Sequence, residues 1–134
     1  MSRELPYGTW PSPVSPEMLT TGAIGLVDVW VDDGRTVWLE SRPAEAGRLQ
    51  IVALDGDGTH RDVLPDGFSA RSGVHEYGGG AAWVEGGWVW FVNWVDQRLY
   101  VMPLDGSRRP QALTPDGSPP RAHRYADMRR SPDG

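Results

Sequence analysis

The sequence repeats itself at an interval of 50 residues (48 to 98), and this repeat constrains the fold more than any other feature. Residues 48–56 read Arg-Leu-Gln-Ile-Val-Ala-Leu-Asp-Gly, and residues 98–106 read Arg-Leu-Tyr-Val-Met-Pro-Leu-Asp-Gly. The tripeptide Pro-Asp-Gly begins at residue 65 and again at residue 115, which is the same interval. Repeats of about 40–50 residues that each hold four short strands are typical of β-propeller blades.

Apolar alternation and turn signals predict four strands in each repeat. In the first repeat we expect strands at 24–31, 36–40, 48–54 and 59–64. In the second repeat we expect them at 80–84, 88–94, 98–104 and 110–113. The 17 glycines and 12 prolines favour such short strands joined by turns over long helices. The fold class is therefore all-β, with two four-stranded antiparallel blades.

The two ends of the chain depart from the repeat. Residues 1–14 predict an extended lead-in, and Ser15-Pro16-Glu17 then predicts a short helix with Met18 and Leu19 on its buried face. Near the other end, residues 124–130 predict the first strand of a third blade, and Ser-Pro-Asp-Gly at 131–134 its turn. The expected units are 1–22 (lead-in and helix), 23–67 (blade), 68–117 (blade) and 118–134 (linker and start of a third blade).

Two blades and part of a third cannot close a ring. The end blades would expose apolar faces and open sheet edges to water. We therefore expect these residues to be the N-terminal part of a longer protein, a partial β-propeller. For the same reason we expect the isolated chain to be marginally folded or prone to aggregation.

Composition excludes several classes of function. The 13 basic and 18 acidic residues give a net charge of −5, which disfavours a nucleic-acid or anionic-membrane surface. Cysteine is absent, so no disulfide and no thiolate nucleophile or ligand is expected. No apolar stretch resembles a secretory signal or reaches membrane-spanning length, so a cytoplasmic location is expected.

The junction between the repeats, Val-His-Glu-Tyr-Gly-Gly-Gly at 74–80, is the most distinctive local motif. Its three glycines allow positive φ or a very close approach of another segment. In the favoured interpretation, His75, Glu76 and Tyr77 tie two blades together through hydrogen bonds. In the other, they contact substrate: Glu76 attracts a peptide's amino terminus and Arg71 a carboxylate. The candidate substrate-binding residues are thus Arg71, His75, Glu76 and Tyr77.

Other motifs do not carry chemistry. None of the nine serines lies in the Gly-x-Ser-x-Gly context of a nucleophile elbow, so no catalytic residue is assigned. Glycines 78–80 lack the Gly-Lys-Ser/Thr of a phosphate loop. The carboxylates of Asp55 and Asp57 resemble a calcium loop, but His60 occupies the position that requires glycine. No metal or cofactor is expected.

Four tryptophans lie between residues 83 and 94, which could indicate a sugar-stacking surface. The favoured interpretation is an apolar core between blades, because aromatic side chains fill such interiors. The strand at 88–92, Trp-Val-Trp-Phe-Val, is apolar at every position. We therefore expect both of its faces to be covered.

Four motifs together resemble the start of bacterial serine peptidases of the prolyl oligopeptidase family, in the dipeptidyl or acylaminoacyl peptidase-like branch. They are Pro-Tyr-Gly-Thr-Trp-Pro-Ser-Pro at 6–13, His-Glu-Tyr-Gly-Gly-Gly at 75–80, Asp-Gln-Arg-Leu-Tyr at 96–100 and Arg-Tyr-Ala-Asp at 124–127. The resemblance implies an N-terminal propeller that covers a C-terminal α/β-hydrolase domain and restricts entry to short peptides. The hydrolase domain carries the Ser-Asp-His triad, so no triad residue can be assigned to this chain.

The leading hypothesis is a non-catalytic N-terminal propeller segment that gates and contacts short peptides for that hydrolase domain. Its partners would be the hydrolase domain and short peptides. A second hypothesis is a self-assembling propeller that serves as a binding or scaffold protein. A third is the start of another propeller enzyme, such as a lactonase or quinoprotein, although the sequence shows no ligand set for a metal or cofactor.

Overall fold

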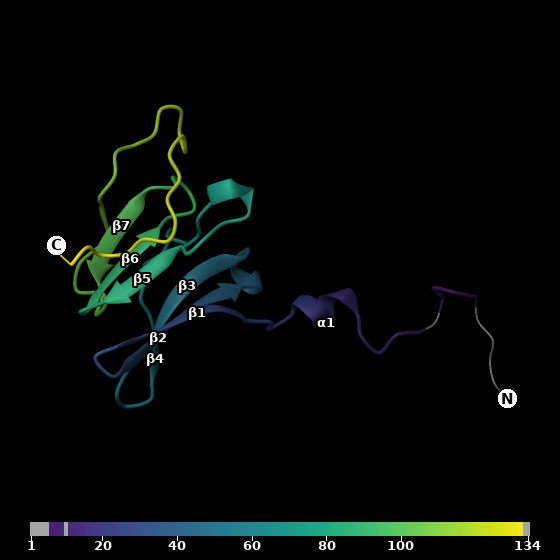
Figure 1. Cartoon of the computed structure of the whole chain (residues 1–134). Coiled ribbons are helices and arrows are strands. Elements are labelled where there is room, and N and C mark those ends of the chain that lie inside the picture. Colours follow the sequence, from purple (N-terminus) through teal and green to yellow (C-terminus); the bar gives the residue numbers. More distant parts are fainter. Residues whose placement is uncertain (1–5, 10, 133–134) are drawn as a thin grey trace.

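The computed structural model describes residues 6–9 and 11–132, and these form two antiparallel four-stranded sheets with very little helix (Figure 1). The first sheet contains β1 (Gly25–Asp32), β2 (Arg35–Arg42), β3 (Arg48–Leu54) and β4 (His60–Asp62), in that order. The second contains β5 (Ala82–Glu85), β6 (Trp88–Val92), β7 (Leu99–Pro103) and β8 (Gln111–Ala112), again in sequence order. The all-β fold with two four-stranded units is confirmed, and it is consistent with part of a propeller.

The repeat in the sequence is also a repeat in register. In the first sheet, Trp38 of β2 lies opposite Val29 of β1 and Val52 of β3. In the second sheet, Val89 of β6 lies opposite Val84 of β5 and Met102 of β7. Val52 and Met102 are 50 residues apart, which is the repeat interval, and each faces the second strand of its own sheet. The two sheets therefore have the same strand arrangement.

The core lies between the two sheets, and it is formed by one face of each. Its fully buried residues are aliphatic and aromatic, as a dry interior between packed sheets requires. From the first sheet they include Val37, Leu39, Ile51 and Ala53, and from the second Val84, Val89, Phe91 and Met102. Phe68 packs edge-on against Phe91 at a ring-centroid distance of 5.8 Å and closes the core where the chain crosses between the sheets.

The segment that crosses between the sheets is bonded to both. Ala70 donates its N–H to the carbonyl of Leu49 in the first sheet, and Arg71 donates to the carbonyl of Val92 in the second. A second link joins the hairpin turns, where the carboxylate of Asp32 accepts hydrogen bonds of 2.7 Å from the N–H groups of Gly86 and Gly87. The relative position of the two sheets is therefore set by polar contacts as well as by the core.

The predicted positions of the eight strands agree closely with the structure. The predictions for helix α1, for the burial of Trp88 and for residues 124–130 differ from it. Helix α1 (Pro16–Thr20) forms with Ser15 as its N-cap, but Met18 and Leu19 are exposed. Their predicted burial is wrong because α1 lies away from both sheets (Figure 1). Trp88 is also exposed, at 37%, so only part of β6 is covered on both faces.

The predicted strand at 124–130 is not formed as a strand. The segment lies beside Gly80, just before β5, and makes one pair of hydrogen bonds there, from Asp127 N–H to Gly80 O and from Gly80 N–H to Asp127 Oδ1. Asp127 has a left-handed φ of 56°, which interrupts an extended strand. A strand requires a continued ladder, and the other side chains of the segment make separate contacts instead. Of its predicted turn, residues 133–134 lie outside the described residues. In the part of the chain that is described, no helix is long and apolar enough to cross a bilayer.

Candidate functional site

The glycine junction is a contact surface for the segment at 124–127. The N–H of Asp127 donates to the carbonyl of Gly80 at 2.8 Å, and the N–H of Gly80 donates to Oδ1 of Asp127 at 3.0 Å. A Cβ atom placed on Gly79 would lie 2.8 Å from Cβ of Ala126, and one on Gly80 would lie 2.5 Å from Oδ1 of Asp127. The glycines therefore permit the close approach that the sequence suggested as one of their two roles.

Side chains before the glycines extend the same contact. The guanidinium of Arg124 forms an ion pair with Glu76 and donates a 2.7 Å hydrogen bond to the carbonyl of Gly73. The hydroxyl of Ser72 donates to the carbonyl of Tyr125 at 2.6 Å. Residues 72–80 thus hold the segment at 124–127 over most of its length. Two of the motifs that carried the family resemblance contact each other directly.

The backbone of the junction is unusual at His75 and Glu76. Both have left-handed conformations, with φ values of 53° and 68°, which non-glycine residues seldom adopt. The His75 ring stacks on Tyr77 at a centroid distance of 6.0 Å, and both side chains are exposed to solvent. Left-handed residues of this kind cost about 1–2 kcal/mol each. The contacts of Arg124 with Glu76 and with the carbonyl of Gly73 span this turn and offset part of that cost.

A pocket of about 340 Å³ lies between the bulge in β1 and the glycine junction. Its apolar wall comes from Val27, Leu39 and Leu49 of the first sheet. Its opposite side is the backbone of residues 78–81 together with Arg71, Ser72 and Tyr77. The register of β1 shifts between Leu26 and Asp28, and this bulge turns Asp28 towards the pocket.

Arg71 is held at this pocket by an aromatic partner. Its guanidinium carbon lies 4.3 Å from the ring centroid of Trp94, and that of Arg121 lies 4.6 Å from the same ring. Buried Gln97 fixes the loop, because its side-chain oxygen accepts from Gly73 N–H at 2.6 Å and its amide donates to Trp94 O. Within residues 6–9 and 11–132, neither arginine forms an ion pair. Their positive charge is therefore available to an anionic group.

The structure separates the four residues predicted from the sequence. Arg71 and Tyr77 line the pocket, and Tyr77 is 88% exposed. Glu76 points to Arg124 instead, and His75 does not line the pocket. Sequence reasoning missed Asp28 and Trp94. The sequence did mark Asp28 as unusual, because it is an acid in the middle of an apolar strand. It did not show the β-bulge that directs Asp28 towards the pocket.

The pocket has groups that can bind a polar ligand. It offers one cation, Arg71, one carboxylate, Asp28, and backbone groups of the glycines. Across the described ranges, no three histidine, aspartate or glutamate side chains gather as a metal site would need. The arrangement can hold a small polar molecule that has both charges and an apolar side chain.

Solved structures of peptidases match this chain over nearly its whole length. The structure of a puromycin-hydrolyzing peptidase of Mycobacterium tuberculosis has a TM-score of 0.82 and 39% identity, and the match covers 97% of this chain and 20% of that one. A puromycin hydrolase structure has a TM-score of 0.77 and 31% identity, and the match covers 96% of this chain and 21% of that one. The structure of a mutant of puromycin hydrolase complexed with PGG has a TM-score of 0.76 and 31% identity, and the match covers 96% of this chain and 21% of that one.

The chain therefore spans about one-fifth of the length of the peptidases that it matches. No family model matches the sequence, and no curated protein matches it. The matched peptidases confirm the resemblance to the prolyl oligopeptidase family that the motifs indicated, and the similarity is to the N-terminal, propeller-like portion of such proteins.

Proposed function

We propose that this chain, a relative of prolyl oligopeptidase-family peptidases that corresponds to their N-terminal propeller-like portion, is a non-catalytic part that admits and contacts short peptides. The observation that supports the proposal is the 39% identity over 97% of the chain to a puromycin-hydrolyzing peptidase. Bond cleavage then belongs to a C-terminal α/β-hydrolase domain, which carries the Ser-Asp-His triad. This chain contributes the entrance and some of the substrate contacts.

The pocket beside the glycine junction is the proposed contact site for peptides. Arg71 provides a guanidinium that pairs with a carboxylate, and Trp94 holds that guanidinium in place. Asp28 provides the opposite charge for an amino group, in place of Glu76, which is engaged by Arg124. The apolar wall of Val27, Leu39 and Leu49 accommodates a side chain of the peptide.

A chimera tests whether the chain acts as a peptidase part. The matched segment of the puromycin-hydrolyzing peptidase is replaced by this chain, and puromycin hydrolysis is measured. We expect the chimera to hydrolyse puromycin, while the 134-residue chain alone gives no hydrolysis. Hydrolysis by the chain alone, or a folded chimera without activity, would contradict the proposal.

A binding measurement tests the peptide contact separately. Calorimetric titration of the chain with a short peptide that has a free carboxyl end is compared with titration with the same peptide amidated. We expect the free peptide to bind about tenfold more tightly, and Arg71→Ala to remove the difference. Arg109→Ala is the control, since Arg109 is exposed and lies outside the pocket. Equal binding of both peptides to the unchanged chain would refute the role of Arg71.

A further inference from the structure

The indole ring of Trp94 carries two arginines. The guanidinium carbon of Arg71 lies 4.3 Å from the ring centroid, and that of Arg121 lies 4.6 Å from it. The two guanidinium carbons are therefore separated by no more than these two distances taken together. In the part of the chain that the structure describes, Trp83 and Trp88 each stack on a single arginine. Two positive charges held on one ring repel each other, and an anion beside them relieves that repulsion.

Arg121 differs from the other half-buried arginines in its polar contacts. Solvent does not reach its Nε, and this N–H has no hydrogen-bond partner among the described residues. A buried donor without an acceptor costs about 1–3 kcal/mol. An anion bound by the other nitrogens of the guanidinium would offset that cost. The other half-buried arginines of the described chain all donate hydrogen bonds to carboxylates or carbonyls, and they are Arg42, Arg48, Arg61 and Arg98.

The backbone at Arg121 is strained. Ala122 donates its N–H to the carbonyl of Pro119 at 3.1 Å, so residues 119–122 form a tight turn with Arg121 as its third residue. Arg121 has a left-handed φ of 64°, and glycine or asparagine is usual at such a turn position. Arginine in this conformation costs about 1–2 kcal/mol. Strain of this kind is concentrated where a side chain is placed for function, and here the turn places Arg121 on Trp94.

Arg121 and Arg71 are held against the same loop. A Cβ atom placed on Gly73 would lie 3.7 Å from Nη2 of Arg121 and 3.1 Å from Oε1 of Gln97. Gln97 is fully buried, and its amide donates to the carbonyl of Arg71 at 3.3 Å. Arg124, three residues after Arg121, donates to the carbonyl of Gly73. One side of the pocket therefore carries two guanidinium groups, that of Arg71, which lines it, and that of Arg121 on the same indole ring.

The acidic groups near these arginines have other partners. The carboxylate of Glu76 pairs with Arg124, and that of Asp127 accepts the N–H of Gly80. Asp28 lines the same pocket from β1, where its carboxylate accepts the N–H of Val29 at 2.9 Å. Among the described residues, no carboxylate pairs with either arginine on Trp94. A carboxylate that neutralises them can therefore come from a ligand.

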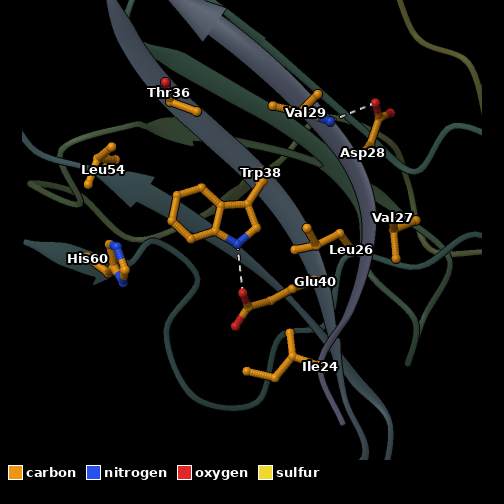
Figure 2. Close-up of a pocket in the computed structure, with 10 residues that line it drawn as sticks. All are labelled: Ile24, Leu26, Val27, Asp28, Val29, Thr36, Trp38, Glu40, Leu54 and His60. Atoms are coloured by element: carbon orange, nitrogen blue, oxygen red, sulfur yellow. Dashed lines mark hydrogen bonds between the residues drawn. The ribbon is translucent and has the colours of Figure 1, made fainter.

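The tryptophan of the first sheet has the opposite surroundings. Figure 2 shows Trp38 in a largely apolar groove, where its Nε1–H donates to the carboxylate of Glu40 at 2.6 Å. The described residues that line this groove include no arginine. Glu40 would repel a carboxylate there. An acidic ligand is therefore favoured at Trp94 and disfavoured at Trp38.

We propose that the pocket beside the glycine junction prefers peptides whose last residue is glutamate or aspartate. Arg71 binds the α-carboxylate of that residue, and Arg121 binds its side-chain carboxylate. A short flexible chain joins the two carboxylates, so one residue can reach both guanidinium groups on the Trp94 ring. The inference rests on the proposed function, because it takes the carboxyl end of the peptide to lie at Arg71. It adds a second carboxylate contact and so defines a class of substrate.

Calorimetric titration of the chain with Leu-Gly-Glu and with Leu-Gly-Gln tests the proposal. The two peptides have nearly the same shape and differ by one carboxylate. We expect Leu-Gly-Glu to bind about tenfold more tightly, and high salt to reduce the difference.

Substitutions at Arg121 assign this preference to one residue. Arg121→Gln should remove the preference for Leu-Gly-Glu, and Arg121→Lys, which keeps the charge, should retain most of it. Glutamine and lysine meet the same left-handed backbone as arginine, so the turn tolerates them equally. Arg108→Gln is the matched control. Arg108 also stacks on a tryptophan, Trp88, at 5.1 Å, but it is exposed and lies outside the pocket.

A second measurement does not depend on the stability of the isolated chain. The same peptides are compared as inhibitors of puromycin hydrolysis by the chimera with the puromycin-hydrolyzing peptidase. Leu-Gly-Glu should inhibit at about tenfold lower concentration than Leu-Gly-Gln, and Arg121→Gln in the chimera should remove the difference. Equal binding and equal inhibition by the two peptides, or a preference that survives Arg121→Gln, would overturn the inference.

The proposed function would fail in a different way. Leu-Gly-Gln and its C-terminal amide would then bind equally, because no contact would be made with the α-carboxylate. A chain that discriminates between Leu-Gly-Gln and its amide, but not between Leu-Gly-Glu and Leu-Gly-Gln, would refute only the role of Arg121.

Discussion

Arg48 and Arg98 stand at equivalent positions of the two repeats, and each binds the turn that ends its own repeat. Arg48 donates hydrogen bonds to the carbonyls of Leu64, Pro65 and Phe68, and Arg98 donates to the carbonyl of Thr114 at 2.8 Å. Arg98 also pairs with Asp116 at 2.8 Å. The arginine at the start of β3, and its counterpart directly before β7, thus each fix the Pro-Asp-Gly turn that follows the fourth strand of the repeat.

The first prediction concerns this arginine contact. Arg48→Ala should lower the free energy of unfolding by about 2 kcal/mol, because its hydrogen bonds to carbonyls are lost in a half-buried position. Urea unfolding followed by tryptophan fluorescence measures the change. Arg109→Ala, at an exposed position, should change stability by less than about 0.5 kcal/mol. Equal effects of the two substitutions would show that the contact does not stabilise the repeat.

The second prediction concerns the close approach at the glycine junction. Gly79→Ala would place a methyl group 2.8 Å from Cβ of Ala126, so the segment at 124–127 must move away. We expect a loss of about 1–3 kcal/mol and faster amide exchange at Asp127, whose N–H bonds to Gly80. Gly56→Ala is the matched control, since an added Cβ there meets nothing within 4 Å. Unchanged exchange at Asp127 in the Gly79→Ala protein would disprove the steric account.

The third prediction concerns the link between the hairpin turns. Asp32→Ala removes the acceptor of two 2.7 Å hydrogen bonds from Gly86 and Gly87. Charge-assisted bonds of this kind justify an expected loss of about 1–3 kcal/mol. Asp32→Asn keeps one side-chain oxygen and should lose less. Amide exchange at Gly86 and Gly87 is the direct measurement, and exchange as slow as in the unchanged chain would rule out the link.

The fourth prediction concerns alkaline pH. Burial and the hydrogen bond that its hydroxyl donates to Asp96 raise the pKa of Tyr100 to about 12. Between the ordinary tyrosine pKa of 10.0 and that value, the unfolded chain loses this proton while the folded chain keeps it. The contribution of Tyr100 to the free energy of unfolding should therefore be fully present below the pKa of the unfolded chain. It should be lost as pH rises from that value towards the pKa of the folded chain.

Tyr100→Phe provides the comparison for that prediction. It keeps the ring that stacks on Phe91 at 5.7 Å but has no proton to lose. Denaturant midpoints measured at successive alkaline pH values should fall less steeply for the variant than for the unchanged chain. Parallel curves for the two proteins would mean that Tyr100 is not the group responsible.

Much of the fold could be predicted because it depends on local patterns. The alternation of apolar residues and the Asp-Gly turns placed β3 at 48–54, which agrees with Arg48–Leu54 in the structure. The buried face of α1 could not be predicted in this way. The sequence pattern shows that Met18 and Leu19 are apolar neighbours on the helix surface. It does not show whether another element packs against them, and in the structure both are exposed.

The candidate site was predicted only in part. The glycines at 78–80 pointed to a close approach, and the structure identifies the segment that approaches as 124–127. The sequence could not show that Arg124, rather than a ligand, takes the charge of Glu76. Nor could it show that Trp94 holds Arg71 at the pocket, because these residues meet only when the chain crosses between the sheets.

The sequence by itself determined the repeating unit, since four strands and their turns are specified by neighbouring residues within about 50 positions of one another. It also determined the family resemblance, since the motifs lie in short continuous stretches. Only the tertiary structure decided which face of each sheet is covered. The alternation of side chains gives every strand two faces, and packing against a second sheet buries Val84 but leaves Val29 exposed.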